Sequence, residues 1–275
     1  MFSGMADVVT TRVVDTGWLL TRVPDRDVVV VEVTTANWKD LLWHRARREF
    51  PTAHELADRL QAVGANANST VVFAGEPTQF AAYALWVATA VGVGGDLRYL
   101  DGGLPALRSM DLRSAERAAP LVESATTAPL PVVAPRIDEL VAGRDEVLAA
   151  IASPTAILDL RSPEEYSGLR VAPVSESIDH GAERAGHIPG AKSLPVLELL
   201  DEHGRLRPVD EIRSRVAEVG VDGAESIIAY CRLSHRAALG WLIFTDLLDD
   251  PRVRVYDGSW TEWGSLVGAP VEFEP

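Results

Sequence analysis

The sequence has a single cysteine, Cys231, in 275 residues. One thiol excludes an internal disulfide, so the chain is not a disulfide-stabilised secreted scaffold. Basic side chains are also in deficit, because 26 Lys and Arg stand against 40 Asp and Glu, which gives a net charge of −14 and a pI near 4.9. A surface this acidic argues against binding of nucleic acid or of an anionic membrane by the whole surface of the molecule.

Long hydrophobic runs are missing as well. The apolar stretches are shorter than a membrane span, and residues 1–7 lack the basic and apolar regions of a signal peptide. We therefore expect a cytoplasmic protein whose first residue is Met1 or Met5. The hydrophobic content of 47% and charged content of 24% are those of a globular protein, and 275 residues are enough for two domains.

The pattern of apolar residues predicts strands that alternate with helices. In the first half the strands are expected at residues 28–33, 71–74 and 97–100, and the helices at 52–63 and 79–91. Thr52 and Glu55 have the spacing of a capping box at the start of the first of these helices. Such alternation predicts a parallel sheet with both faces covered.

A stretch rich in Ala, Pro, Ser and Thr at residues 113–135 indicates an extended connector. We place a first domain at residues 1–125, a linker at 126–139 and a second domain at 140–275. In the second half the pattern predicts a helix at 136–151, a strand at 156–160, a helix that starts at Ser162-Pro163, a helix at 209–219, a strand at 227–230, a helix at 237–248 and a strand at 253–256.

The two halves contain a weak internal repeat. Residues 72–76 align with 227–231, Trp86 then falls on Trp241 without a gap, and residues 100–107 align with 256–263 after one extra residue. Glu76 occupies the position of Cys231 in the first copy. The first half therefore has no thiolate chemistry, and we expect it to be structural or to form a wall of the active cleft.

Residues 231–236, here called the Cys231 loop, lie between a predicted strand and a predicted helix. A lone cysteine is most often a small buried hydrophobe. This one, however, meets the free N–H groups and the positive dipole end of a helix, and Arg232, His235 and Arg236 add positive charge nearby. Both effects favour the thiolate, which is the nucleophilic form, and both attract an anionic substrate.

Four motifs of the second half resemble those of a known family. They are Asp159-Leu-Arg-Ser-Pro-Glu-Glu-Tyr166, Gly186-His-Ile-Pro-Gly-Ala191, the run from Tyr230 through Arg236, and Asp257-Gly-Ser-Trp-Thr-Glu-Trp-Gly264. The chain resembles the two-domain rhodaneses, which are thiosulfate and 3-mercaptopyruvate sulfurtransferases. The resemblance implies an α/β fold of two tandem rhodanese-like domains, each a central parallel sheet flanked by helices. It also implies a catalytic second domain, a degenerate first domain and an active site near their interface.

The details of the Cys231 loop refine what the resemblance implies. Sulfurtransferases of this family have a six-residue loop, as here, whereas related phosphatases have a longer Cys-x5-Arg loop that accommodates phosphate. Because Arg232 follows the cysteine directly, the loop resembles that of the thiosulfate branch, whereas the mercaptopyruvate branch has glycine at this position. The chain has Ser234 where the family usually has glycine. Because serine does not adopt a positive φ freely, we expect a strained or altered loop.

These observations lead to a mechanistic hypothesis. Cys231 attacks the outer sulfur of thiosulfate, sulfite leaves, and a thiol or cyanide acceptor then takes the sulfur from the Cys231 persulfide. The substrate-binding residues are expected to be Arg232, Leu233, Ser234, His235 and Arg236, with the two arginines on the sulfonate and His235 adding charge when it is protonated. Asp159 and Arg161 are expected to support the loop. No metal or organic cofactor is needed.

Other interpretations remain open. The protein could be a catalytically weak binding or regulatory protein with the same fold, a 3-mercaptopyruvate-using sulfurtransferase, or a phosphatase or arsenate reductase, which the loop length opposes. The partners are expected to be a small anionic sulfur donor and a thiol or cyanide acceptor. The default assembly is a monomer or weak dimer. Residues 169–185, of mixed charge, are predicted to be a surface insertion near the cleft.

Overall fold

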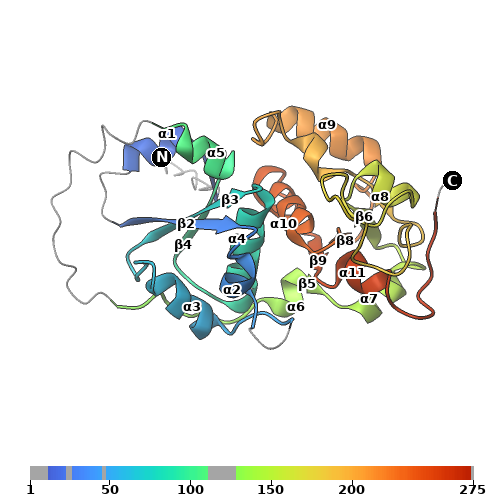
Figure 1. The fold of residues 1–275 in the computed structure, drawn as a ribbon, viewed down its shortest axis with the longest axis horizontal. Helices are drawn as coiled ribbons and strands as arrows, with labels where there is room; N and C mark the ends of the chain where they lie inside the picture. The colour runs from blue at the N-terminus through green and yellow to red at the C-terminus, as the bar shows by residue number, and fades with distance from the viewer. Residues whose placement is uncertain (1–11, 23–26, 45–47, 111–127, 274–275) are drawn as a thin grey trace, which may run out of the picture.

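A computed structural model describes residues 12–22, 27–44, 48–110 and 128–273 of the chain. It contains two sheets flanked by helices, which lie side by side in Figure 1. Every pairing between neighbouring strands within them is parallel. The predicted α/β fold with two parallel sheets is confirmed.

The first sheet has four strands in the order β1-β4-β3-β2. Its strands are β1 (Val13–Val14), β2 (Val28–Thr34), β3 (Thr70–Glu76) and β4 (Asp96–Leu100). The helices around it are α1 (Thr16–Arg22), α2 (Trp38–Leu42), α3 (Ala53–Gln61), α4 (Gln79–Val91) and α5 (Gly103–Arg108). β3 is apolar and buried along its middle because the sheet and α4 cover it.

The second sheet has five strands in the order β5-β9-β8-β6-β7. Its strands are β5 (Val141–Ala142), β6 (Ala156–Asp159), β7 (Lys192–Ser193), β8 (Ile227–Tyr230) and β9 (Val253–Tyr256). The helices are α6 (Ile137–Leu140), α7 (Arg144–Ala150), α8 (Pro163–Ser167), the 3-10 helix η3 (Val196–Leu199), α9 (Val209–Val219), α10 (His235–Leu242), the π-helical turn η4 (Ile243–Leu247) and α11 (Ser259–Trp263).

Local sequence signals located most of these elements. α4 has the predicted bounds, and α3 begins with the predicted capping box, in which Thr52 Oγ1 accepts the Glu55 N–H at 3.2 Å and the Glu55 carboxylate accepts the Thr52 N–H at 2.8 Å. The predicted repeat corresponds to β3-α4-β4-α5 in the first half and β8-α10-β9-α11 in the second.

Two helix predictions were wrong in extent. The helix expected at residues 136–151 is α6, β5 and α7, because Val141 and Ala142 pair with Val255 and Tyr256 at the edge of the sheet. The helix expected at 237–248 begins two residues earlier, at His235, and continues after Leu242 as the π-helical turn η4.

The two repeated helices α4 and α10 pack against each other between the sheets (Figure 1). Trp86 and Trp241, the aligned tryptophans of the repeat, are both buried there. An ion pair also ties the start of the chain to the second half, because Arg12 contacts Asp246 at 2.5 Å and its guanidinium lies 4.6 Å from the centre of the Trp241 ring. One hydrophobic cluster therefore runs through both halves of the molecule.

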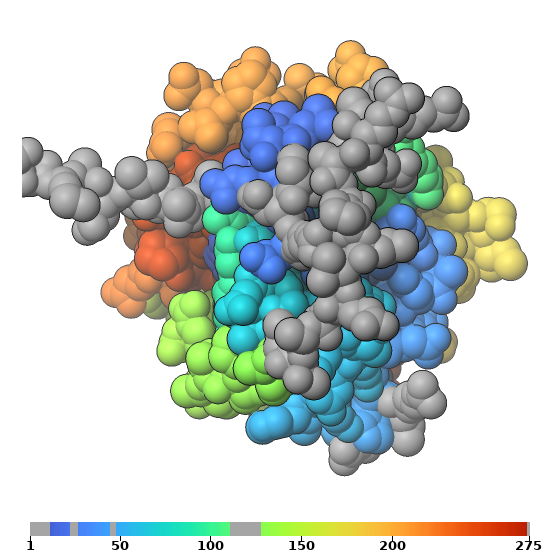
Figure 2. Space-filling model, turned by 90° about the vertical axis from the view of Figure 1, so that its left-hand side faces the viewer, coloured from blue at the N-terminus to red at the C-terminus, as the bar shows by residue number. Residues whose placement is uncertain are grey.

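The described residues that follow position 127 run along the first half before they enter the second. The Ala67 N–H donates to Ala128 O at 2.9 Å, and the Arg136 N–H donates to Ala90 O at 2.8 Å. Figure 2 shows this run in lime green against the first half. The predicted linker starts outside the described residues, and its boundaries remain a proposal.

No helix among the described residues is both long and apolar enough to cross a membrane.

Candidate functional site

The Cys231 loop joins the end of β8 to the start of α10. Cys231 is buried, with 1% of its surface exposed. Its N–H donates to Ser259 Oγ at 3.2 Å, and its carbonyl accepts the Trp260 N–H at 2.9 Å. The start of α11, the helix that follows the neighbouring strand β9, therefore fixes the position of the cysteine backbone.

After Cys231, the backbone N–H groups of the loop have no acceptor among the described residues. The carbonyls of Cys231, Arg232 and Ser234 accept hydrogen bonds, whereas none of the N–H groups of residues 232–236 donates to a described residue. They surround the N-terminus of α10, an eight-residue helix whose dipole favours negative charge there. Together they form a set of donors that suits a thiolate, a persulfide or a bound oxyanion.

Ser234 has the backbone conformation expected for a glycine. Its φ of 71° and ψ of −15° are left-handed, and its hydroxyl donates to Asp257 O at 2.6 Å. The hydroxyl thus anchors a strained residue to the segment after β9, which a glycine cannot do.

Arg236 is held by a partner that the sequence analysis did not assign to the loop. Its guanidinium makes two hydrogen bonds, of 2.6 and 2.8 Å, to the carboxylate of Glu165, and both residues are buried. Burial opposes the charged form, but Glu165 and the nearby Cys231 outweigh it and raise the pKa of the Arg236 guanidinium. The sequence signal that draws attention to Glu165 is the capping box of α8, in which its carboxylate also accepts the Ser162 N–H.

Arg232 points to residues 169–185, which thus lie beside the loop. Its Nη2 donates to the His180 carbonyl at 2.9 Å and lies 3.0 Å from His180 Nδ1. Its Nη1 is 3.4 Å from a Glu176 carboxylate oxygen, and its buried Nε has no partner among the described residues. The sequence had no signal for Glu176 or His180 as partners of the loop.

His235 enters an aromatic pocket made by the first half of the chain. Its ring centre lies 4.4 Å from those of Trp38 and Phe80 and 4.8 Å from that of Tyr83. Burial first, and then the nearby arginines, lower the pKa of His235 to about 3, so the imidazole is neutral near pH 7. His235 would therefore add positive charge only under acidic conditions, and its place among the substrate-binding residues stays a prediction. Leu233, by contrast, is only partly buried.

Asp159 and Arg161 lie under the loop. The Arg161 guanidinium contacts the Asp159 carboxylate at 2.6 Å and also donates to Gly186 O at 2.7 Å, and both side chains are fully buried. The hydroxyl of Tyr230, the residue before Cys231, donates to the same carboxylate at 2.5 Å. This placement suits bracing of the loop rather than contact with a substrate.

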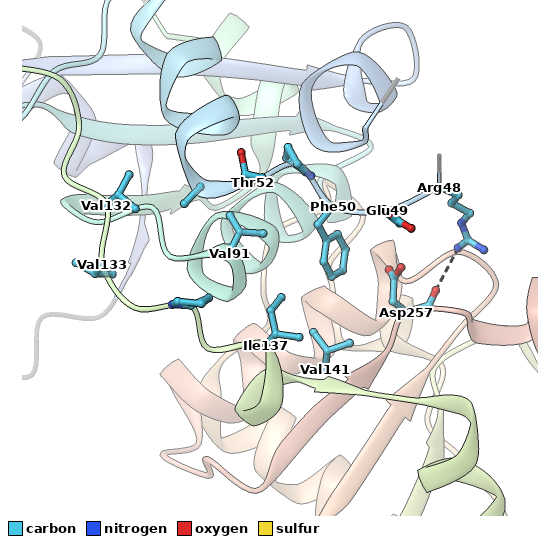
Figure 3. Close-up of a pocket in the computed structure, with 13 residues that line it drawn as sticks. Arg48, Glu49, Phe50, Thr52, Val91, Val132, Val133, Ile137, Val141 and Asp257 are labelled. Carbon is cyan, nitrogen blue, oxygen red and sulfur yellow. Dashed lines mark hydrogen bonds between the residues drawn. The ribbon is translucent and has the colours of Figure 1, made fainter. Parts of the chain in front are cut away.

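A separate hollow of about 630 Å³ lies between the two halves. Figure 3 shows Phe50, Val91 and Ile137 turned toward it and the hydrogen bond of 3.1 Å from Arg48 to Asp257 O at one end. Its lining includes no residue of the Cys231 loop, and we do not assign it to the reaction. Within the described residues, no group of three His, Cys, Asp or Glu side chains is placed to hold a metal ion.

Comparisons with known proteins identify the family of the chain. The family model described as a Rhodanese-like domain matches residues 143–266. A protein of Mycolicibacterium smegmatis named "Putative thiosulfate sulfurtransferase" is 37% identical over 86% of this chain and 83% of its own length. "Sulfur carrier protein TtuD" of Thermus thermophilus is 32% identical over 94% of this chain and 95% of its own length.

The fold also matches solved structures. The anaerobic ergothioneine biosynthesis enzyme from Chlorobium limicola has a TM-score of 0.73 and 21% identity, over 97% of this chain and 72% of that chain. This likeness concerns the fold alone, whereas the relatives above match most of the sequence. The chain belongs to the two-domain rhodanese family of sulfurtransferases.

Proposed function

We propose that the protein is a thiosulfate sulfurtransferase that carries sulfur as a Cys231 persulfide. The observation that supports this most directly is the set of free N–H groups around a buried cysteine at a helix N-terminus. The names of several relatives support the substrate, since they are called putative thiosulfate sulfurtransferases. Arg232 next to the cysteine fits an anionic donor.

The first half-reaction breaks one S–S bond and forms another. The Cys231 thiolate attacks the outer sulfur of thiosulfate, and the bonding electron pair leaves with sulfite. The loop N–H groups and the charged Arg236 stabilise the negative charge on the thiolate and then on the persulfide. Arg232 receives the sulfonate end of the donor, while Asp159 and Arg161 keep the loop in place through Tyr230.

The second half-reaction returns the thiolate. A thiol acceptor or cyanide attacks the outer sulfur of the persulfide and takes it, and the electron pair of the broken bond returns to Cys231. Neutral His235 and half-buried Leu233 form the wall beside the first half of the chain. The name of the Thermus relative makes delivery of the sulfur to a protein acceptor a second candidate for this step.

The persulfide is tested by intact-mass measurement after incubation with thiosulfate. We expect wild type to gain the mass of one sulfur atom and to lose it again on addition of cyanide, with formation of thiocyanate. Cys231→Ser, which keeps the size of the residue but not its nucleophile, should show no gain. Absence of the gain in wild type with thiosulfate and with 3-mercaptopyruvate would refute the enzyme proposal and leave a binding protein.

A further inference from the structure

Residues 169–185, here called the insertion, form a loop with its own internal hydrogen bonds. Arg170 donates to Ala172 O at 3.1 Å and to Glu176 O at 3.0 Å. The Asp179 carboxylate accepts the N–H groups of Val171 and Ala172 at 2.9 and 2.8 Å. Because these bonds fix the path of the backbone, the insertion presents Glu176 and His180 to the Cys231 loop in a defined position.

The insertion closes tightly around one side chain, the guanidinium of Arg232. Gly181 has a φ of +114°, and a Cβ there would lie 2.8 Å from both Nε and Nη2 of Arg232. The positive φ favours glycine at this position, and a Cβ there would also displace the guanidinium. The two contacts of Nη2 with His180 fix the direction of the guanidinium, so that Nη1 faces the Glu176 carboxylate.

Among the described residues, Glu176 is the carboxylate in ion-pair contact with Arg232. The separation of 3.4 Å from Nη1 to the Glu176 carboxylate is long for an ion pair, and the Glu176 side chain is 44% exposed while that of Arg232 is 9% exposed. A partly exposed carboxylate in a long contact can move into solvent at little cost. The oxygens of a sulfonate group or of sulfite are, like those of a carboxylate, anionic hydrogen-bond acceptors.

We propose that Glu176 is a competitor built into the site: it occupies the place beside Arg232 that the oxyanion end of the sulfur donor takes, and the insertion thereby sets donor affinity. The inference depends on the proposed function for the identity of the donor. Binding of the donor moves Glu176 outward, while His180 continues to hold the guanidinium through Nη2. Glu176 is thus a specificity-determining residue that weakens the binding of small anions in general.

The test measures the binding of sulfite, the anionic product, to the intact protein by calorimetry at low salt, alongside the KM and kcat for thiosulfate. Glu176→Gln keeps the size of the side chain and removes its charge. We expect sulfite affinity to rise about two- to fivefold, the range expected for a partly exposed ion pair, and the KM for thiosulfate to fall by a similar factor with kcat unchanged.

The matched control is Glu183→Gln, because Glu183 is exposed on the same insertion and makes no ion pair with Arg232 in the described structure. It removes the same charge and should leave sulfite affinity unchanged. The effect of Glu176→Gln should also vanish when Arg232 is replaced by Ala. Equal gains for both glutamine variants would show a general effect of net charge and would overturn the proposal.

Three other results would also overturn it: no change in Glu176→Gln, weaker sulfite binding in that variant, or no sulfite binding by any variant. Weaker binding would mean that Glu176 orients Arg232 rather than competes with the donor. The proposed function fails separately, if wild type forms no persulfide with thiosulfate. Sulfite binding that responds to Glu176 but not to Glu183 would support the competition even then.

Discussion

Ser234 holds a conformation that costs free energy and recovers part of it through its side chain. A non-glycine residue in the left-handed region costs about 1–2 kcal/mol. The hydrogen bond from its hydroxyl to Asp257 O, at 2.6 Å, offsets about 1 kcal/mol of that cost. The serine therefore joins the Cys231 loop to the segment after β9 and compensates for the absence of glycine.

Two substitutions separate these contributions. Ser234→Ala loses the hydrogen bond and keeps the strain, so we expect the free energy of unfolding to fall by about 1 kcal/mol. Ser234→Gly loses the same bond but relieves the strain, so its free energy of unfolding should stay within about 1 kcal/mol of wild type and above that of the alanine variant. Urea denaturation measures both, and a glycine variant less stable than the alanine variant would contradict this account.

At the scale of elements, the Glu165 carboxylate connects two helices. It accepts the Ser162 N–H at the start of α8 and both hydrogen bonds from Arg236 in the first turn of α10. α8 has only five residues and is too short to be stable alone. The buried pair thus fixes α8 against the helix that carries the Cys231 loop, and it keeps a cation near the cysteine.

Glu165→Gln tests this connection. Because the amide leaves the Arg236 cation buried without a countercharge, we expect a loss of about 3–5 kcal/mol in the free energy of unfolding and slower persulfide formation. The neighbour Glu164 is partly buried, lies in the same turn and is not bound to Arg236, so Glu164→Gln serves as the control. It should change stability by less than about 0.5 kcal/mol. Similar losses in the two variants would refute the special role of Glu165.

On the scale of the whole molecule, the two sheets share one hydrophobic cluster. α4 and α10 contact each other, and the aromatic pocket from the first half encloses His235 of the loop. The first half therefore contributes directly to the surroundings of the Cys231 loop, as a wall of the candidate site. A face of α10 this apolar would be exposed to water if the halves separated.

The shared cluster predicts a single cooperative unfolding transition for the full chain. In scanning calorimetry the calorimetric and van't Hoff enthalpies should agree, because neither half keeps its core without the other. Trp86→Ala, which opens a cavity in the shared hydrophobic cluster, should lower the midpoint of the whole transition and cost about 3–5 kcal/mol. Two resolved transitions, with only one shifted by this substitution, would show that the halves unfold independently.

The sequence by itself determined most of the elements and indicated the Cys231 loop as the candidate site. Local patterns located α4 and β8, and the motif around Cys231 indicated the family that the relatives then showed. These signals depend on periodicity and capping over a few neighbouring residues, which are readable along the chain. The same patterns failed at residues 136–151, because pairing of Val141 with Val255 overrode a local preference for helix.

Only the tertiary structure decided which side chains complete the site. Glu165 is 71 residues from Arg236 in the sequence and His180 is 52 residues from Arg232, yet each pair is in contact. The neutral state of His235 likewise depends on burial against aromatic rings from the other half of the chain. Such contacts join distant segments through packing and desolvation, and no pattern of adjacent residues encodes them.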